Sequence, residues 1–460
     1  MTDTLVTPWT PDLAETGRPA YARIVEALAA DIEAGALARG ARLPTQRALA
    51  DRLGVALGTV TRAYAEAEAR GLIDATVGRG SFVAGAAAAA PRREGPIDLA
   101  RNLPPMGPAR RALTASMAQL VRRSDLVERL DYPPDGGFEA DRNAGARWLR
   151  ATSHYPSADP GRLICTAGAQ QGIAVAISAT TRPGETLIVE EATFHGAKLA
   201  ATRCGLAIAA AAMDAEGLRP DALDKAAAET GARVAYVLPF QNPTARVMSL
   251  ARRQEIIAVA RRRRMILIED DLYGAHITDL GLPPLAELAP DCVTYISGLS
   301  KSLAPGLRTG YLAPPPRLVS AAQDALRAIA FGPPALGDLV AVQWIESGLA
   351  FDIYRDVCAE LETRTGIARR LLGAAMEPVA RRRTPHVWLP MGELEAERLA
   401  GRALRAGVQV TSPRAPFVAG TPVTGVRVCL GAADSAAALE PALAVVADAL
   451  SAGAFDEAVV

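Results

Sequence analysis

One lysine constrains this chain more than any other residue. The sequence has 50 basic residues, and only Lys198, Lys225 and Lys301 are lysines. Lys301 lies between two serines, after the apolar run 292–296 and before a turn that contains Pro and Gly. An ammonium can lose its proton in a poorly solvated pocket and attack a carbonyl, whereas a guanidinium stays charged. We interpret Lys301 as a candidate Schiff-base lysine; the alternative is a solvated lysine in a surface loop.

Length and composition are those of a globular chain with more than one domain. The 460 residues are half hydrophobic and carry no formal net charge, so overall charge does not indicate a nucleic-acid or membrane partner. We find no apolar run of membrane-spanning length and no signal peptide, which predicts a cytoplasmic protein without a membrane partner. The five cysteines and four histidines are dispersed, which predicts reduced thiols and no metal site.

The N-terminal part has the apolar spacing of a small helical domain. Residues 1–17 are polar and are expected to form a flexible tail. The predicted elements are helices near 19–35, 45–53 and 57–70, then a two-stranded wing over 72–83 with Gly78, Arg79 and Gly80 at its tip. Two helices joined by a short turn are typical of a helix-turn-helix, whose second helix can enter the major groove of DNA.

A low-complexity stretch separates this part from the rest. Residues 84–96 (AGAAAAAPRREGP) are predicted to be a linker that tethers two domains; the alternative is that the alanines extend as helix. From residue 97 to 460, apolar strand-like segments alternate with helical ones. The predicted strands are Leu163–Cys165, Thr186–Val189, Val234–Leu238, Met265–Ile268, Val293–Ile296 and Thr309–Leu312. This pattern predicts an α/β domain with a mostly parallel sheet wrapped by helices, and a smaller α+β subdomain from about 345 to 460.

Residues 18–83 resemble the winged helix domain of the GntR regulators along its whole length. The matching frame includes GARLP, LADRLGV, TVTRAY and GRGSFV. The resemblance implies binding to double-stranded DNA, with the contacts made by Arg47, Thr59, Thr61, Arg62 and Arg79. The family usually has Ser-Arg after Gly-Val, whereas this chain has Ala56 and Leu57, which removes a helix cap and a DNA-contacting arginine. The alternative is a winged helix that binds another protein.

Three further stretches, PFQNPT, IEDDLYG and SGLSK, resemble the core of fold-type I aminotransferases and occur in the same order. The resemblance implies pyridoxal 5'-phosphate bound covalently by Lys301. Asp270 would hold the pyridine nitrogen protonated, and Asn242 and Tyr273 would reach the phenolic oxygen of the ring. Asp271 is the second candidate for the nitrogen contact, and helix capping is the alternative role for both aspartates.

The same resemblance assigns the remaining cofactor contacts. TAGAQQG follows a strand and opens a helix, as a phosphate site does; its contacts would be Gly168, Ala169 and Gln170, helped by Ser300 and Arg308. The family often has Ser or Thr three residues before the lysine, and Gly298 stands there, so one phosphate hydroxyl is missing. Phe194 matches the ring that stacks on the cofactor; the alternative is an ordinary core phenylalanine.

Two residues carry implications beyond the cofactor. Tyr132 matches a family tyrosine that reaches the cofactor phosphate of the partner subunit, which implies an obligate homodimer with shared active sites. Arg427, in GVRVCLGA, matches the arginine that binds the substrate carboxylate by a two-pronged contact.

A GntR domain, a linker and an aminotransferase-like domain together resemble the MocR subfamily of bacterial transcription regulators. The resemblance implies a head-to-tail homodimer in which an amine effector forms an external aldimine, anchored at Arg427, and so changes DNA binding. Two alternatives remain: a working aminotransferase with a DNA-binding appendage, and a related fold that has lost the cofactor and only dimerises.

Overall fold

The computed structural model describes residues 9–11, 13, 19–38, 40–69, 72–76, 80–83, 95–379, 383–418 and 423–456. The chain divides into two compact units, Met1–Gly95 and Pro96–Val460. Most of the predicted linker, residues 84–94, and the predicted contact residue Arg79 lie outside the described residues.

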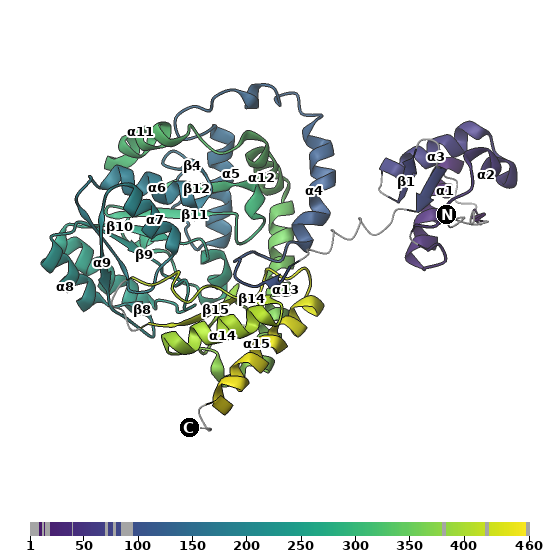
Figure 1. Ribbon diagram of the computed structural model, residues 1–460. Helices are drawn as coiled ribbons and strands as arrows, with labels where there is room; N and C mark the ends of the chain where they lie inside the picture. The colour runs from purple at the N-terminus through teal and green to yellow at the C-terminus, as the bar shows by residue number, and fades with distance from the viewer. Residues whose placement is uncertain are drawn as a thin grey trace. The chain divides into compact units, whose positions relative to one another are not determined.

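The first unit is a winged helix. Helices α1 (Ala20–Glu33), α2 (Gln46–Leu53) and α3 (Leu57–Ala69) pack around one apolar core, and β1 (Ile73–Thr76) pairs antiparallel with β2 (Gly80–Val83) (Figure 1). The side chain of Thr45 caps α2 by accepting a hydrogen bond from the Ala48 amide, and Gly54 ends that helix in the left-handed conformation. Helix α3 starts directly after Ala56, a residue whose side chain cannot cap.

The second unit is built on a seven-stranded sheet in the order β4-β12-β11-β10-β9-β5-β6 (Figure 1). Neighbouring strands are parallel except at β12, which runs antiparallel to both β11 and β4. This confirms the predicted α/β fold class. The strands are β4 (Ile164–Ala167), β5 (Thr186–Glu190), β6 (Ala207–Ala211), β9 (Val234–Val237), β10 (Ile266–Asp270), β11 (Val293–Gly298) and β12 (Thr309–Ala313).

Apolar side chains fill both faces of this sheet, because alternate residues of a strand point to opposite sides. Ile268 and Ile296 belong to one core, and their neighbours Leu267 and Tyr295 belong to the other. Helices α6 (Ala169–Thr180), α7 (His195–Arg203) and α11 (Val319–Ile329) contribute to the first core. The second core includes residues of α4 (Gly107–Leu120), α5 (Glu139–Thr152), α8 (Pro220–Thr230), α9 (Leu250–Arg263), α10 (Leu285–Leu288) and α12 (Ala335–Ser347).

A third core defines the smaller subdomain. It contains Leu99 together with residues from 367 onward, whereas the first half of α13 (Leu349–Leu372) packs in the core of the large subdomain. The long helix α13 therefore belongs to both subdomains. The other elements of the small subdomain are β3 (Ile97–Asp98), β13 (His386–Pro390), α14 (Glu393–Arg405), β14 (Val408–Gln409), β15 (Gly425–Cys429) and α15 (Ala436–Asp456). Short turns of 3-10 helix occur at Glu128–Leu130, Gly274–Leu280, Pro305–Leu307, Pro316–Leu318 and Gly373–Ala375.

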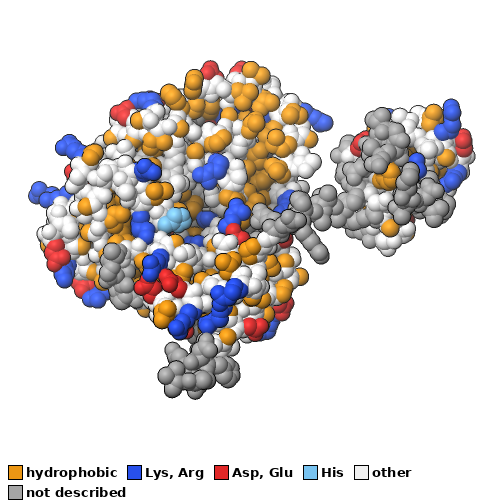
Figure 2. Space-filling view, viewed as in Figure 1, with side chains coloured by type: hydrophobic (Ala, Val, Ile, Leu, Met, Phe, Trp, Pro, Cys, Tyr) orange, Lys and Arg blue, Asp and Glu red, His pale blue; other side chains and the backbone are white. Residues whose placement is uncertain are grey.

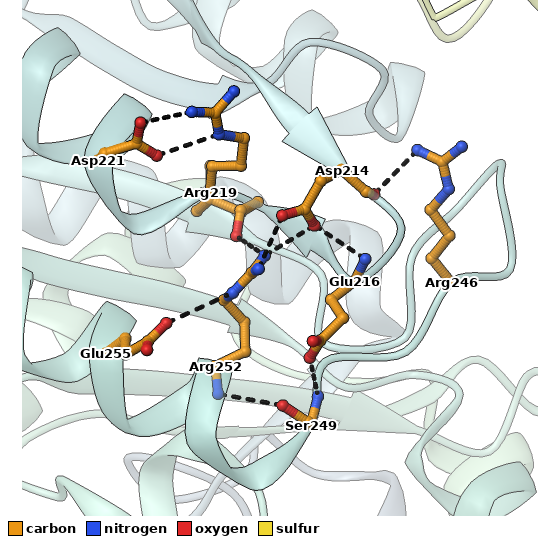
Figure 3. Close-up of polar contacts among 9 residues, drawn as sticks. Asp214, Glu216, Arg219, Asp221, Arg246, Ser249, Arg252 and Glu255 are labelled. Atoms are coloured by element: carbon orange, nitrogen blue, oxygen red, sulfur yellow. Dashed lines mark hydrogen bonds and ion pairs between the residues drawn. The ribbon is translucent and has the colours of Figure 1, made fainter.

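An arginine network fixes the start of α9 in the large subdomain (Figure 3). Arg252 donates to both carboxylate oxygens of Asp214, at 2.9 and 2.7 Å, and to the Leu218 carbonyl at 3.0 Å. These acceptors lie in the hairpin formed by β7 (Met213–Asp214) and β8 (Gly217–Leu218). Arg246 donates to the Asp214 carbonyl, so the network also holds one end of the loop that follows β9.

Replacement of Arg252 by alanine is expected to destabilise the second unit by about 2 kcal/mol, because charged hydrogen bonds to a partly buried hairpin are lost. The control is Arg261→Ala on the same helix, since Arg261 forms an exposed pair with Asp291 that is worth less than about 1 kcal/mol. Thermal unfolding midpoints measure both. Equal midpoints for the two variants would contradict a structural role for the network.

Candidate functional site

The ends of the sheet strands bring the predicted cofactor residues to one edge. Asp270 is the last residue of β10, and Lys301 follows the end of β11 by three residues. Asn242 and Phe194 follow β9 and β5, and both of these strands are parallel to β10 or linked to it through parallel pairs. Because β12 runs the opposite way, Arg308, just before its first residue, lies at this edge too. In open α/β sheets ligands bind at the carboxyl ends of the strands.

A cavity of about 350 Å³ opens at this edge. Its volume falls in the range of small-molecule sites. Ten of the predicted residues line it: Ala169, Gln170, Phe194, Asn242, Asp270, Tyr273, Ser300, Lys301, Arg308 and Arg427. Gly168 lies next to it, since a Cβ atom on Gly168 would stand 2.9 Å from Nη2 of Arg308.

Lys301 is held in the cavity as a poorly solvated amine. Its Nζ donates to the backbone carbonyl of Asn102, and its own carbonyl contacts His276 Nε2 at 2.9 Å. Burial lowers the pKa of Lys301 to about 8, and the charge of Arg427 acts in the same direction, whereas Cys429 and Asp270 act in the opposite one. An amine with this pKa has a substantial neutral, nucleophilic fraction near pH 8.

Two neighbouring aspartates have different surroundings. Asp270 lines the cavity, is buried and accepts hydrogen bonds from the Tyr236 hydroxyl at 2.5 Å and from the Leu272 amide at 3.1 Å. Burial raises the pKa of Asp270, so a cation in the cavity would stabilise its ionised form. Asp271 accepts from the Tyr295 hydroxyl at 2.9 Å and does not line the cavity. The structure thus favours Asp270 over Asp271 for the ring nitrogen.

Asn242, Tyr273 and Arg427 are oriented by hydrogen bonds. Nη1 of Arg427 donates to Oδ1 of Asn242 at 2.7 Å, and Nη2 donates to the Ala100 carbonyl at 3.0 Å. Because Oδ1 of Asn242 is an acceptor here, its Nδ2 group is left as a donor. The Tyr273 hydroxyl accepts from Asn102 Nδ2 at 2.8 Å and keeps its own proton to donate.

The turn before α6 has the form of an anion site. Gly168 has a φ of 75° and starts a 12-residue helix without a side-chain cap, so the first amides of the helix are free to bind an anion. The Arg308 guanidinium donates to the Ala167 carbonyl at 2.8 Å beside this turn. Gly310 lies behind it, where a Cβ atom would stand 2.6 Å from the carbonyl carbon of Gly168.

Sequence reasoning missed several residues of the site. Asn102 and His195 line the cavity, and Tyr236 and His276 contact its residues from behind. The frame IDLARNLPP does precede the first long helix of the domain, but nothing in its composition distinguishes Asn102 from a loop asparagine.

Tyr132 lies away from the cavity of its own chain. Its side chain is 77% exposed, and its ring stands 5.0 Å from that of Phe331.

Four of the five predicted DNA contacts are described. Arg47, Thr61 and Arg62 are exposed and Thr59 is half-buried, on α2 and α3. Thr61 donates to Gln46 at 2.8 Å, and the Arg62 guanidinium lies 3.9 Å from the centre of the Tyr21 ring. Arg62 is thus positioned by a cation–π contact.

Fold and site together define an aminotransferase-like domain of the pyridoxal-phosphate-dependent fold, in a chain that also carries a winged helix. The sequence model of aminotransferase class I and II matches residues 94–446, and that of the bacterial regulatory proteins of the gntR family matches residues 20–83. The chain belongs to the aminotransferase class I and II family and carries a GntR-type helix-turn-helix domain at its N-terminal end.

Two curated relatives and one solved structure are similar to this chain. The HTH-type transcriptional regulator YdeF of Bacillus subtilis is 30% identical over 67% of this chain and 67% of its own length. YdfD, another HTH-type transcriptional regulator of that organism, is 26% identical over 85% of this chain and 89% of its own length. The crystal structure of an archaeal alanine:glyoxylate aminotransferase covers 78% of this chain and 91% of its own, with a TM-score of 0.70 at 20% identity, which shows the shared fold.

The family implies pyridoxal phosphate, and the residues present fit it. The cavity has an amine, a buried carboxylate, an aromatic wall and an anion-binding turn, and a buried Oδ1 of Asn102 lacks a hydrogen-bond partner there.

Within the described part of the chain, no helix is long and apolar enough to cross a membrane.

The lowered pKa of Lys301 predicts a reactivity that can be measured residue by residue. Brief acetylation of the protein without cofactor, followed by peptide mass spectrometry, is expected to give a Lys301 labelling rate that rises with pH to a midpoint near 8. For a lysine with an ordinary pKa, the labelling rate keeps rising with pH and reaches its midpoint at about 10.4. Exposed Lys225 in the same samples reports the rate of the reagent itself. A Lys301 midpoint above 10 would contradict a poorly solvated amine.

Proposed function

We propose that this protein is a DNA-binding transcription regulator of the MocR type that senses an amino compound in its aminotransferase-like domain. One observation supports this most strongly: a single chain carries a winged helix and a cavity lined by both the half-buried Lys301 and Arg427. DNA binding would place its work in the cytoplasm.

The residues of the cavity divide the binding task. When bound, pyridoxal phosphate supplies an aldehyde that condenses with primary amines and a ring that withdraws electrons. Lys301 offers the amine that holds it and takes up or releases a proton at Nζ. Asp270 keeps a negative charge at the buried end, while Gly168, Ala169, Gln170, Ser300 and Arg308 would hold the phosphate. Arg427 would bind the carboxylate of the effector by two parallel hydrogen bonds.

A second cavity suggests the class of effector. It has a volume of about 570 Å³ and shares Ala100, Phe194, His195, Asn242 and Arg427 with the first. Among its lining residues, all of them described, Arg427 is the one cation and Glu397 the one acid. Within this chain a second carboxylate on the effector would therefore have no positive partner there. The effector we propose has one amine, one carboxylate and a side chain without an acid.

We further propose that the chain works as a head-to-tail homodimer with shared sites. Apolar side chains are exposed around α4 and the start of α12, and Figure 2 shows hydrophobic groups gathered on this face. Val127, Leu130 and Tyr132 are 79%, 59% and 77% exposed. Large exposed apolar patches mark interaction surfaces. Tyr132 would reach the cofactor phosphate of the partner from this surface.

Charge on the apolar surface is expected to separate the subunits. Val127→Glu should shift the mass from dimer to monomer in light scattering after size exclusion, because a carboxylate would be buried without a partner. Leu394→Glu is the matched control, since Leu394 is 61% exposed on α14 in the other subdomain. A Val127→Glu protein with the mass of the wild type would contradict this interface.

The function itself is tested by DNA binding at fixed salt. Purified protein is expected to bind its own upstream intergenic DNA better than a scrambled competitor, and pyridoxal phosphate is expected to change that affinity. Lys301→Ala should keep specific binding and lose the response to cofactor and amines. Specific binding that responds to amines in Lys301→Ala as in the wild type would remove Lys301 from the mechanism.

The departures from the family pattern at Ala56 and Leu57 give a further test. Leu57 is 44% exposed at the start of α3, so Leu57→Arg should strengthen DNA binding and steepen its salt dependence by about one ion per added phosphate contact. Arg62→Ala should weaken it. No effect of either change on affinity would favour a winged helix that binds a protein.

A working aminotransferase is the second candidate, because Lys301, Asp270, Asn242 and Arg427 all meet at one cavity. Lys301 would then also move a proton at the amino-acid Cα. Sustained keto-acid production from an amino-acid panel, with no specific DNA binding, would favour this role.

A further inference from the structure

The first segment of the second unit crosses the candidate site. We call residues 98–103, which run from the last residue of β3 toward α4, the strap. Along the chain, the strap comes soon after the winged helix. Among the described residues between β2 and the strap, the only secondary structure is the two-residue strand β3. The strap contributes Ala100, Arg101 and Asn102 to the wall of the cofactor cavity.

One end of the strap is fixed to the small subdomain. The Leu99 side chain is fully buried in its core, the Leu99 amide donates to the Gln409 carbonyl at 2.8 Å, and the Cys429 amide donates to the Leu99 carbonyl at 2.9 Å. At the far end the strap packs closely on Gly431, where a Cβ atom would stand 1.8 Å from the Leu103 oxygen. The strap is therefore attached to the small subdomain and would move together with it.

The middle of the strap accepts hydrogen bonds from Lys301 and Arg427, the two side chains proposed to bind the cofactor and the effector. Arg427 Nη2 donates to the Ala100 carbonyl at 3.0 Å, and Lys301 Nζ donates to the Asn102 carbonyl. Asn102 also donates through Nδ2 to the Tyr273 hydroxyl at 2.8 Å and contacts His386 Nδ1 at 3.0 Å. Lys301 and Tyr273 belong to the large subdomain, so Asn102 joins the two subdomains across the cavity.

We propose that the strap reports the occupancy of the site to the DNA-binding unit, because its carbonyls compete with the ligands for the same donors. This proposal rests on the proposed function. Lys301 joined to the cofactor no longer offers an ammonium to Asn102, and Arg427 that binds a carboxylate gives up its bond to Ala100. Thr411 retains a contact with Ala100 at 3.3 Å, so the strap stays attached to the small subdomain when Arg427 turns away.

The two contacts report different events. The Asn102 contact responds to what is joined to Lys301, and the Ala100 contact responds to a carboxylate at Arg427. A ligand shifts an equilibrium only by its differential contacts with the two states, and here these contacts are hydrogen bonds between charged donors and strap carbonyls. Asn102 is a positioning residue in this device, since it acts through Lys301 and Tyr273.

Amide hydrogen exchange of the full-length protein tests the strap without DNA or effector. Lys301→Met and Arg427→Met remove one donor each. In the protein without cofactor both are expected to accelerate exchange of the 98–103 amides by about tenfold or more, as expected for a lost charged hydrogen bond. Arg308→Met is the matched control, because Arg308 lines the same cavity but donates to Ala167.

The exchange rates of the three variants test the proposed role of the strap. Acceleration in Lys301→Met and Arg427→Met but not in Arg308→Met supports the strap, with unchanged exchange in α9 as the folding control. Unchanged exchange in the first two, or equal acceleration in all three, overturns it. If α9 also exchanges faster, Tyr273→Phe replaces them, since it removes one of the two contacts of Asn102 Nδ2, the other being with His386, with little change of volume. It should accelerate the strap amides alone, and unchanged exchange there overturns the strap. Absence of specific DNA binding would reject the proposed function while this exchange result stands on its own.

Discussion

The poorly solvated amine of Lys301 is the constraint on which the rest of the site depends. A lysine pays a desolvation cost in such a cavity, and that cost lowers its pKa to about 8. The Asn102 carbonyl and the carboxylate of Asp270, both at the edge of the sheet, act on this one group. The same desolvation that makes the amine reactive also makes it dependent on a carbonyl partner, and that partner lies on the strap.

The sheet explains why residues far apart in sequence meet. Parallel strands β5, β9 and β10 end at one edge, and the single reversed strand β12 brings Arg308 to it. Arg427 comes from the small subdomain and bonds to Asn242 of the large one at 2.7 Å. The site therefore lies between two subdomains that are joined through α13 and the strap, which is a suitable arrangement for converting ligand binding into movement.

Much of this was predictable from sequence, for physical reasons. Six of the seven sheet strands coincide with apolar runs of the sequence, and the cofactor residues lie where those runs end. Strand β6 was missed because its sequence, AIAAA, has little β propensity and an edge position requires less. Asn102 was missed because its role comes from hydrogen bonds to Lys301 and Tyr273, which only the folded chain brings near it. Tyr132 had a clear sequence match, but one chain alone leaves it 77% exposed.

The central claim is that one chain couples amine binding near Lys301 to DNA binding at the winged helix. Coupling between two sites is reciprocal, so operator DNA must change the affinity for the amine by the same factor by which the amine changes the affinity for DNA. The direct measurement is a spectral titration of the cofactor-loaded protein with an amino-acid ligand, in the presence and absence of saturating specific DNA. The account predicts a shifted midpoint with DNA, equal in factor to the shift of DNA affinity with ligand. The same midpoint in both titrations would contradict it.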